Sequence, residues 1–484
     1  MKKVILALCN LLLAMPLSYA QHKPLLYDFY EIPQAIMLNP GMKTPFQWHV
    51  GVPLLSGFSM QAGTSGVTVN DLFANDGLDF TTKIRDRVVN SMVKNDELGG
   101  SGQIELIHVG FRSRNRPDDY FSFGMYGEGF LSLFWPQDLA ILAFEGNGAN
   151  IGRRFNLNHI AMEGEAVNVL HFGINRSLND AWTVGARAKV YSSVFGFRSA
   201  NNTGSFVTLP GQDNILRNTI DADVTLRTSG VKEFLDIIDE DTDTTRRDLI
   251  DKFISRSLFG GNLGLGFDLG FTHNFGNRGH VTASLLDLGF IYHTNAIENY
   301  TVKGTASNEG VFIELPEDLT NFNNDLWRDL VDDLEEKVPF DTNEKAFITL
   351  RPIKLNASLR YNLGASRNAI KDCGCALNTT SSNGAYMDYV SAVGGHLSMI
   401  YRPRGPQAAL TAFYQHRLAN TIILKSTYTI DKYSLSNIGL GFNLQAGPVN
   451  MYVLADNLLG YANIADSNYA SLQFGFNILS WNSN

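Results

Sequence analysis

The chain has 484 residues, with 39 Lys and Arg against 48 Asp and Glu, which gives a formal net charge of −9. This mildly acidic balance, without a block of basic residues, gives no reason to expect a nucleic-acid partner. The composition is rich in Gly (44), Phe (31) and Tyr (18) and poor in Pro (15), which suits many long strands. Apart from the N-terminus, no stretch approaches the ~18 apolar residues of a membrane-spanning helix.

Residues 1–20 have the organisation of a secretory signal peptide. Lys2 and Lys3 form a charged start, residues 4–15 form a short apolar core, and residues 18–20 are a small-x-small cleavage site. We therefore expect an exported protein whose mature chain begins after residue 20.

Residues 21–45 are apolar but irregular. The prolines Pro24, Pro33, Pro40 and Pro45 disfavour regular structure. The segment is nonetheless too apolar for a free tail, since it carries Tyr27, Phe29, Tyr30, Ile32, Ile36, Met37 and Leu38. We predict that it folds back as a hatch that plugs the protein. The alternative is a periplasmic strap along the rim.

From residue 46 to the end, large apolar residues repeatedly alternate with small polar ones. In 262–275, Leu, Phe and His occupy one face and Gly, Asn, Thr and Asp the other, which is the period of a long strand. Large apolar residues opposite small polar ones suit a strand between lipid and an aqueous lumen. Because an open sheet would leave edge groups unpaired in lipid, the pattern predicts a closed barrel. The same alternation returns at 184–191, 355–364, 437–446 and 470–478.

The predicted fold class is all-β, a transmembrane antiparallel β-barrel of about 14 strands over residues 46–484. Strands are expected around 47–61, 102–113, 119–132, 157–176, 181–199, 218–228, 262–275, 279–293, 300–314, 346–364, 391–403, 408–418, 420–431, 435–446, 449–457 and 468–479.

Three insertions interrupt this β pattern with apolar residues at helical spacing, near 80–98, 231–258 and 319–338. They are predicted to form a cap of helices over one barrel mouth, on the extracellular side where such barrels carry their long loops. The alternative is loop padding that packs on itself.

Little in the sequence indicates catalysis or a metal. Neither Gly-x-Ser-x-Gly nor His-x-x-Glu-His occurs, so we expect no enzyme and no cofactor. Residues 239–243 resemble the start of a calcium loop, but Thr244 replaces the turn Gly and Ile250 the bidentate Glu, which favours a solvated acidic loop. Cys373 and Cys375 lie in a loop-like stretch as a disulfide or as idle thiols, because no further Cys or nearby His completes a zinc set.

Charged residues of both signs fall on the predicted lumen faces of the strands. They form either an ion-pair network that fills the interior or a polar path for a solute. Mixed charge favours the network, since the field of a porin-like pore would be one-sided. The residues are Arg112, Glu128, Glu163, Glu165, Arg187, Lys189, Asp268 and Arg360.

Four short motifs carry a resemblance to a known family. They are Leu-Asn-Pro-Gly at 38–41, His-Val-Gly-Val-Pro-Leu-Leu at 49–55, Ser-Leu-Leu-Asp-Leu-Gly-Phe-Ile at 284–291 and Leu-Ala-Asp-Asn-Leu-Leu at 454–459. With them the chain resembles an uncharacterised outer-membrane family of Bacteroidota, a domain of unknown function whose members look like fatty-acid-transporter barrels. That wider class carries Asn-Pro-Ala in its hatch, which Asn39, Pro40 and Gly41 match except at the third residue. The resemblance implies a 14-strand barrel in the outer membrane with a hatch around these residues, and supplies no substrate.

Two functions are expected from these patterns. The first is the binding or passive transport of a small apolar or amphipathic molecule, through a pocket between hatch and helical cap, in a barrel surrounded by outer-membrane lipid. The second is a non-transporting adaptor that binds another outer-membrane protein of a secretion or surface-assembly complex. A lateral gap and an apolar lumen pocket would favour transport, and a sealed lumen with large exposed loop patches would favour the adaptor.

Overall fold

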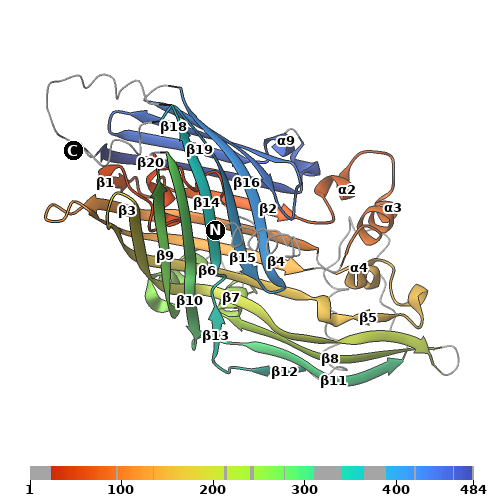
Figure 1. The fold of residues 1–484 in the computed structure, drawn as a ribbon. Coiled ribbons are helices and arrows are strands. Elements are labelled where there is room, and N and C mark those ends of the chain that lie inside the picture. The colour runs from red at the N-terminus through yellow and green to blue at the C-terminus, as the bar shows by residue number, and fades with distance from the viewer. Residues whose placement is uncertain are drawn as a thin grey trace, which may run out of the picture.

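A single antiparallel sheet closes on itself to form a barrel (Figure 1). The structure is a computed structural model, and it describes residues 23–93, 96–134, 136–211, 215–239, 245–276, 278–309, 340–364, 389–418, 421–461 and 463–481. Residues 1–22, which hold the predicted signal peptide, lie outside this part of the chain, as do the predicted helix 319–338 and the two mature cysteines.

The barrel wall has fourteen strand positions, here called staves, and two of these positions are each occupied by two shorter strands in line. Strands β1 and β2 both pair with β3 and with β20, so together they make one stave, and β13 and β14 both pair with β10. The prediction of a closed antiparallel barrel of about 14 strands is therefore confirmed. In ring order the staves are β1 (Phe46–Gly51) with β2 (Phe58–Thr64), β3 (Glu97–Arg112), β4 (Asp119–Phe134), β6 (Ala161–Ser177), β7 (Trp182–Pro210), β9 (Asn262–Phe275), β10 (Gly279–His293), β13 (Phe347–Leu350) with β14 (Lys354–Leu363), β15 (Ser391–Arg402), β16 (Gly405–Arg417), β17 (Ile422–Ile430), β18 (Asn437–Ala446), β19 (Val449–Asp456) and β20 (Tyr469–Trp481).

The alternation read from the sequence sets the inside and the outside of this wall. On β9, Leu265 and Phe267 are 52% and 57% exposed, whereas the neighbouring Asp268 is fully buried. The large apolar side chains therefore face outwards, and the small polar ones face the lumen. An apolar outer surface on a closed barrel satisfies every backbone group within the wall, which is what a lipid environment requires.

The two ends of the barrel differ in their connections. Short turns such as 113–118, 178–181 and 447–448 join the strands at one end, which is the periplasmic end by the usual asymmetry of such barrels. Helices gather at the other end (Figure 1). The short elements there are α2 (Val69–Phe73), α3 (Phe80–Lys83), η2 (Ile84–Val89), α4 (Gln137–Phe144), η3 (Gly148–Asn150), β5 (Arg154–Asn156), η4 (Leu157–His159), α9 (Leu458–Tyr461) and η8 (Ile464–Asp466). No described helix is long and apolar enough to cross a membrane.

The sheet continues beyond the barrel at the helical end (Figure 1). Strand β7 runs past its predicted end to Pro210, because its second half pairs with β8 (Leu216–Ser229). Strand β8 in turn pairs with β11 (Asn299–Glu309), and β11 pairs with β12 (Phe340–Asn343). One face of this extension packs with η2 and α4 in a cluster of Ile84, Val88, Val89, Met92, Ala140, Ile141, Phe155 and Phe206.

The helical insertions differ from the prediction in extent and in place. The first helix ends at Val89, and Glu97 begins β3 because it pairs with Phe134. The second insertion forms α5 (Val231–Asp239), α6 (Thr245–Ser255) and η6 (Arg256–Gly260). It does not cap the mouth as expected. Ser192 lies opposite the exposed Leu263 on the outer face of the wall, and its hydroxyl donates to the Arg256 carbonyl at 2.7 Å, so η6 lies against the outside of the barrel.

The interior of the barrel is filled by the N-terminal plug, residues 23–45. Its one regular turn is η1 (Pro33–Met37). The plug forms a core with wall residues from both sides of the barrel, consisting of Leu25, Leu26, Phe29, Tyr30, Ile32, Ala35, Ile36, Met42, Phe46, Tyr120, Ile423, Tyr452, Leu454 and Leu479. The irregular segment therefore lies in the lumen rather than along the rim.

Candidate functional site

Wall side chains bind the plug through its backbone carbonyls. An irregular segment has carbonyls without a ladder partner, and buried carbonyls need donors. The wall supplies them from lumen-facing cationic, amide and hydroxyl side chains. The bonds are Lys425 to Tyr27, Arg360 to Asp28 (2.8 Å), Asn450 to Glu31 (3.3 Å), Arg187 to Ile36 (2.6 Å) and Met37 (3.1 Å), Ser284 to Leu38 (2.6 Å), Asn175 to Pro40 (2.7 Å) and Met42 (2.8 Å), and Arg112 to Thr44 (2.7 Å).

The Asn-Pro-Gly turn of the plug fits against two wall glycines. The Asn39 side-chain oxygen accepts from the Gly41 amide at 2.9 Å, and its amide nitrogen donates to the Phe271 carbonyl at 3.3 Å. Gly185 of β7 and Gly270 of β9 are paired, and a Cβ on either would overlap the turn. A Cβ on Gly41 would overlap the Gly270 carbonyl, so this close approach explains why glycine stands at the third position of the motif.

A chain of ion pairs crosses the lumen beside the plug. It links β7 and β9 to β10, β14, β4 and β6, so it ties together strands that are far apart in sequence. The pairs are Arg187–Asp268 (3.0 Å), Lys189–Asp268 (2.8 Å), Lys189–Asp287 (2.7 Å), Lys354–Asp287 (2.9 Å), Lys354–Glu128 (3.2 Å), Arg351–Glu128 (3.2 Å) and Arg351–Glu165.

This chain, hereafter the lumen network, contains five of the eight lumen residues named from the sequence: Glu128, Glu165, Arg187, Lys189 and Asp268. Sequence reasoning missed its other three members. Asp287 lies at a β-bulge in β10 with a positive φ of 59°, so strand alternation does not predict its direction. Arg351 lies in the break between β13 and β14, where the alternation stops, whereas Lys354 begins β14 in phase with the inward Asn356 and could have been read from the alternation.

The remaining three predicted lumen residues lie apart from the lumen network. Glu163 faces Arg198 at 3.5 Å towards the helical end. Arg112 lies at the periplasmic rim, where it donates to the Thr44 and Pro117 carbonyls at 2.7 Å. Arg360 lies between the rings of Tyr30 and Tyr389, 4.8 Å from each centroid.

Arg360 belongs to a second polar group that holds the plug. It donates to the Gln415 side chain at 2.9 Å, and Gln415 donates to the carboxylate of Glu31 in the plug at 3.1 Å. Glu31 also receives hydrogen bonds from Arg417 at 2.5 Å and from Tyr389 at 2.5 Å. The plug is therefore fixed by a buried ion pair as well as by its carbonyls.

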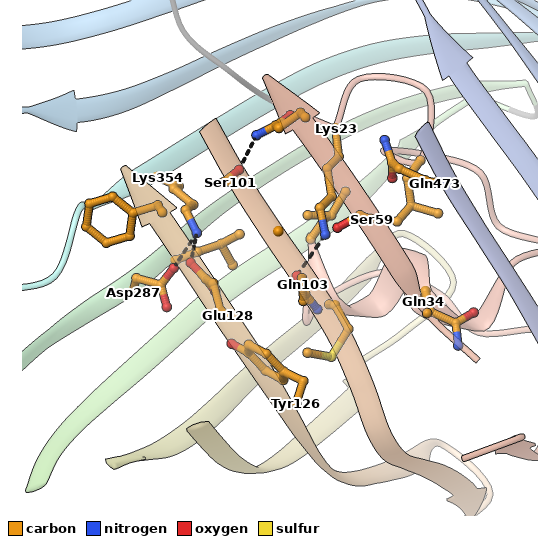
Figure 2. A pocket seen from close by; sticks show the side chains of 18 of the residues that line it. Lys23, Gln34, Ser59, Ser101, Gln103, Tyr126, Glu128, Asp287, Lys354 and Gln473 are labelled. Carbon is orange, nitrogen blue, oxygen red and sulfur yellow. Dashed lines mark hydrogen bonds and ion pairs between the residues drawn. The ribbon is translucent and has the colours of Figure 1, made fainter. Parts of the chain in front are cut away.

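A pocket of about 100 Å³ lies in the lumen between the plug and the wall (Figure 2). Its lining is amphipathic. Lys354 points at Asp287 and Glu128, and Lys23 of the plug donates to Gln103 at 2.7 Å. Burial lowers the pKa of Lys23 to about 8, although the nearby Glu128 carboxylate acts in the opposite direction. The apolar lining comes from Leu26, Met37, Leu38, Phe58, Phe130, Leu286 and Ile400.

A second cavity, a groove of about 880 Å³, lies on the outside of the same part of the wall. One side of this outer groove is formed by Phe253, Ile254 and Leu258 of α6 and η6, and the other by strands β2, β3, β4 and β6. The pocket and the groove are back to back, because the same wall residues line both. These residues are Phe58, Ser59, Gln61, Ser101, Gly102, Gln103, Glu128 and Phe130.

The wall is irregular beside the two cavities, whereas the strands that lie between them are continuously paired. The stave of β1 and β2 breaks at residues 52–57, and β3 has a bulge between Glu105 and Ile107 on the adjacent stave. Leu54 and Leu55 of the break are 53% and 52% exposed on the outside. Residues 52–57 still bond to both neighbouring strands, since the Leu54 amide donates to the Glu105 carbonyl at 3.0 Å and the Phe476 amide donates to the Leu55 carbonyl at 2.9 Å.

Within the described residues, no group of three or more His, Cys, Asp or Glu could hold a metal ion. The predicted acidic loop lies largely outside this part of the chain, since residues 240–244 are not described.

Three solved barrel structures align with nearly the whole chain at low identity. They are a Pseudomonas aeruginosa FadL homologue (9% identity, TM-score 0.38, 93% of this chain and 94% of that chain), the CymD monoaromatic hydrocarbon channel (10%, 0.38, 94% and 94%) and the Pseudomonas putida toluene transporter TodX (9%, 0.34, 94% and 94%). At these values the likenesses carry no conclusion about ligand or activity. No curated protein matches the chain.

The closed barrel with its apolar outer surface is the architecture of an outer-membrane protein, and the chain is an outer-membrane β-barrel. A family model described as a family of unknown function, DUF5723, matches residues 40–456. Because the match covers most of the chain, from the plug turn to the end of β19, the protein belongs to the family DUF5723.

Proposed function

We propose that the barrel binds a small apolar or amphipathic molecule and passes it passively through the wall, between the lumen pocket and the outer groove. The observation that carries this proposal is the back-to-back arrangement of the two cavities around residues such as Ser101, Gln103 and Glu128. Passage requires the paired strands β2, β3 and β4 to part locally, and the regular pairing of the first of them ends beside the cavities, at residues 52–57.

A path along the barrel axis is much less compatible with the plug. Moving the plug would break the Arg417–Glu31 ion pair and leave the buried Arg187 and Arg360 without their carbonyl acceptors. Buried charges that lose their partners are costly. A sideways route leaves all of these bonds in place.

The linings indicate the chemistry of the molecule. The outer groove is almost wholly apolar, whereas the lumen pocket combines Leu286 and Ile400 with the charged ends of Lys354 and Glu128. A molecule with an apolar body and at most a small polar end matches the chemistry of both linings, and the lumen pocket of about 100 Å³ must widen to hold it. Because the lumen pocket is small, a large polar solute does not fit the route.

Uptake of the apolar dye N-phenyl-1-naphthylamine by cells that produce the protein tests this route. Gly129 of β4 lines the outer groove, and its Cβ position is open, with the Glu165 carbonyl 3.7 Å away. Gly129→Leu should narrow the groove and lower uptake towards that of cells without the protein. Ala412→Leu, on the outer face of β16 and outside the groove, is the matched control and should leave uptake unchanged. Equal uptake with wild-type protein, Gly129→Leu and no protein would contradict the route.

The adaptor function is the second candidate, and one observation favours it. Helices α5 and α6 expose apolar residues outside the barrel, with Leu235, Ile238 and Ile250 each 50% exposed. Such a surface could bind another outer-membrane protein. Stoichiometric co-purification of such a protein, lost in Ile250→Asp, together with dye uptake no higher than without the barrel, would select this function.

A further inference from the structure

The α5–α6–η6 insertion is fixed to the outside of the wall by polar bonds. Asn168 and Ser192 face outwards, where unpaired polar groups are unfavourable in lipid. Asn168 donates to the Ser257 carbonyl at 3.3 Å, and the Ser192 hydroxyl accepts from the Phe259 amide at 3.2 Å. The buried Arg256 is held at 2.9 Å by Glu233 of α5. The insertion is therefore attached to the outer surface by specific hydrogen bonds and an ion pair.

The outer groove beneath this insertion lies at the depth of the outer leaflet. Phe111, Phe121 and Phe172 form a contacting row of outward aromatic rings near the periplasmic turns, as expected of an interfacial girdle. Leu131 in the groove lies ten residues further along β4 than Phe121. Since a tilted strand needs about 9–11 residues to cross the bilayer, the groove lies in the half of the membrane on the helical side.

The wall side of the outer groove is hollowed by glycines. Gly100 and Gly102 of β3 and Gly127 and Gly129 of β4 all line it. A Cβ added at these positions would have its nearest neighbours at 3.5, 3.8, 3.6 and 3.7 Å, which is ordinary contact. The absence of side chains there therefore leaves real space, opposite the apolar side chains of α6.

We propose that the outer groove retains one hydrocarbon chain of an outer-leaflet lipid, held between the glycine wall and α6. Its volume of about 880 Å³ lies in the range of ligand clefts of ~300–1,000 Å³. Its mouth is in the bilayer, so lipid chains are the molecules that reach it at the highest concentration. A chain in the groove contacts protein on two sides, whereas a chain on the rest of the barrel contacts protein on one side.

This inference deepens the proposed function, and it rests on that function in one respect. If the outer groove is the outer end of the route, the resident chain is the competitor that a passing molecule displaces. Retention of the chain does not depend on whether anything passes.

Native mass spectrometry of the full mature protein, released from nanodiscs of phosphatidylethanolamine and phosphatidylglycerol, tests the lipid site. The wild-type protein and Ala412→Leu should each retain one lipid at collision energies that remove the others. The double variant Gly102→Leu/Gly129→Leu should retain none. Equal retention by all three proteins, or a statistical spread of lipid numbers in the wild type, would overturn the proposal.

A second measurement keeps the test independent of how well the double variant folds. Benzoylphenylalanine placed at Ile254 in the outer groove should crosslink on irradiation to an alkyne-tagged palmitoyl chain at one lipid per protein. The same probe at Leu410, an exposed residue of β16, should crosslink weakly and in proportion to lipid concentration. Similar concentration dependence at both positions would overturn the lipid site.

Lipid retention and dye uptake of the double variant separate the lipid site from the route. Loss of the retained lipid with unchanged dye uptake would support the site and contradict the route. Retained lipid with lost uptake would overturn the site alone.

Discussion

Asp287 joins the two halves of the lumen network, because it contacts Lys189 at 2.7 Å and Lys354 at 2.9 Å. We predict that Asp287→Asn removes the carboxylate that the buried Lys189 shares with the half-buried Lys354, and lowers the free energy of unfolding by about 3 kcal/mol, because each lysine keeps one other carboxylate. The measurement is a urea titration of protein refolded in phospholipid vesicles. Asp223→Asn is the control, because Asp223 pairs with Lys303 at 3.0 Å on the exposed extension and should cost less than about 1 kcal/mol. Equal costs would show that the lumen network does not stabilise the barrel.

The facing of single residues gives a second test. Phe267 is 57% exposed on the outer face of β9, so Phe267→Arg places a charge in lipid and should cost about 2–4 kcal/mol near the midplane. Gln61 lines the lumen pocket, and Gln61→Arg should cost clearly less because its side chain enters a polar space. The same urea titrations compare the two variants. A greater cost for Gln61→Arg would reverse the assignment of inside and outside.

At the scale of elements, the plug and the wall are matched by shape as well as by hydrogen bonds. We predict that Gly185→Leu, which would overlap the Pro40 carbonyl, releases the Asn-Pro-Gly turn while the barrel still forms. Trypsin should then cut after Lys43, which is buried in the docked plug, and intact mass spectrometry would detect the cut. Gly129→Leu, on the outer face, should remain uncut. Protection of Lys43 in Gly185→Leu would mean that the turn does not hold the plug.

The sequence predicted single elements well where one periodicity continued. The alternation in 262–275 identified β9 and its outward Phe267, because both faces of that strand keep their character to the end. It did not predict the part of β7 beyond residue 199, which leaves the membrane and forms a strand through its pairing with β8.

The sequence predicted less well where the elements lie relative to one another. The spacing in 231–258 showed an amphipathic helix, but an apolar helix face packs equally well on a protein core or against lipid, so its place on the outer wall was missed. Asp287 was not predicted because a bulge turns it into the lumen, and Arg351 was not predicted because it lies in a break between strands. The candidate site depends on these interruptions, which a periodic pattern cannot locate.

At the scale of the whole molecule, the plug closes the axis of the barrel, and the proposed route therefore runs through the wall. The plug fills the lumen with an apolar core, and the lumen network contributes both signs of charge. A general ion pore would instead keep an open channel with a dominant charge. The polar bonds between the wall and the plug keep the axis closed, because they cross the space through which an ion would have to pass.

Ion conductance of the purified mature protein in planar lipid bilayers measures whether the plug closes the barrel axis. We predict little steady conductance from the intact protein and a clear rise when trypsin has cut the plug of Gly185→Leu at Lys43. A large, stable conductance from the intact wild-type protein would contradict it.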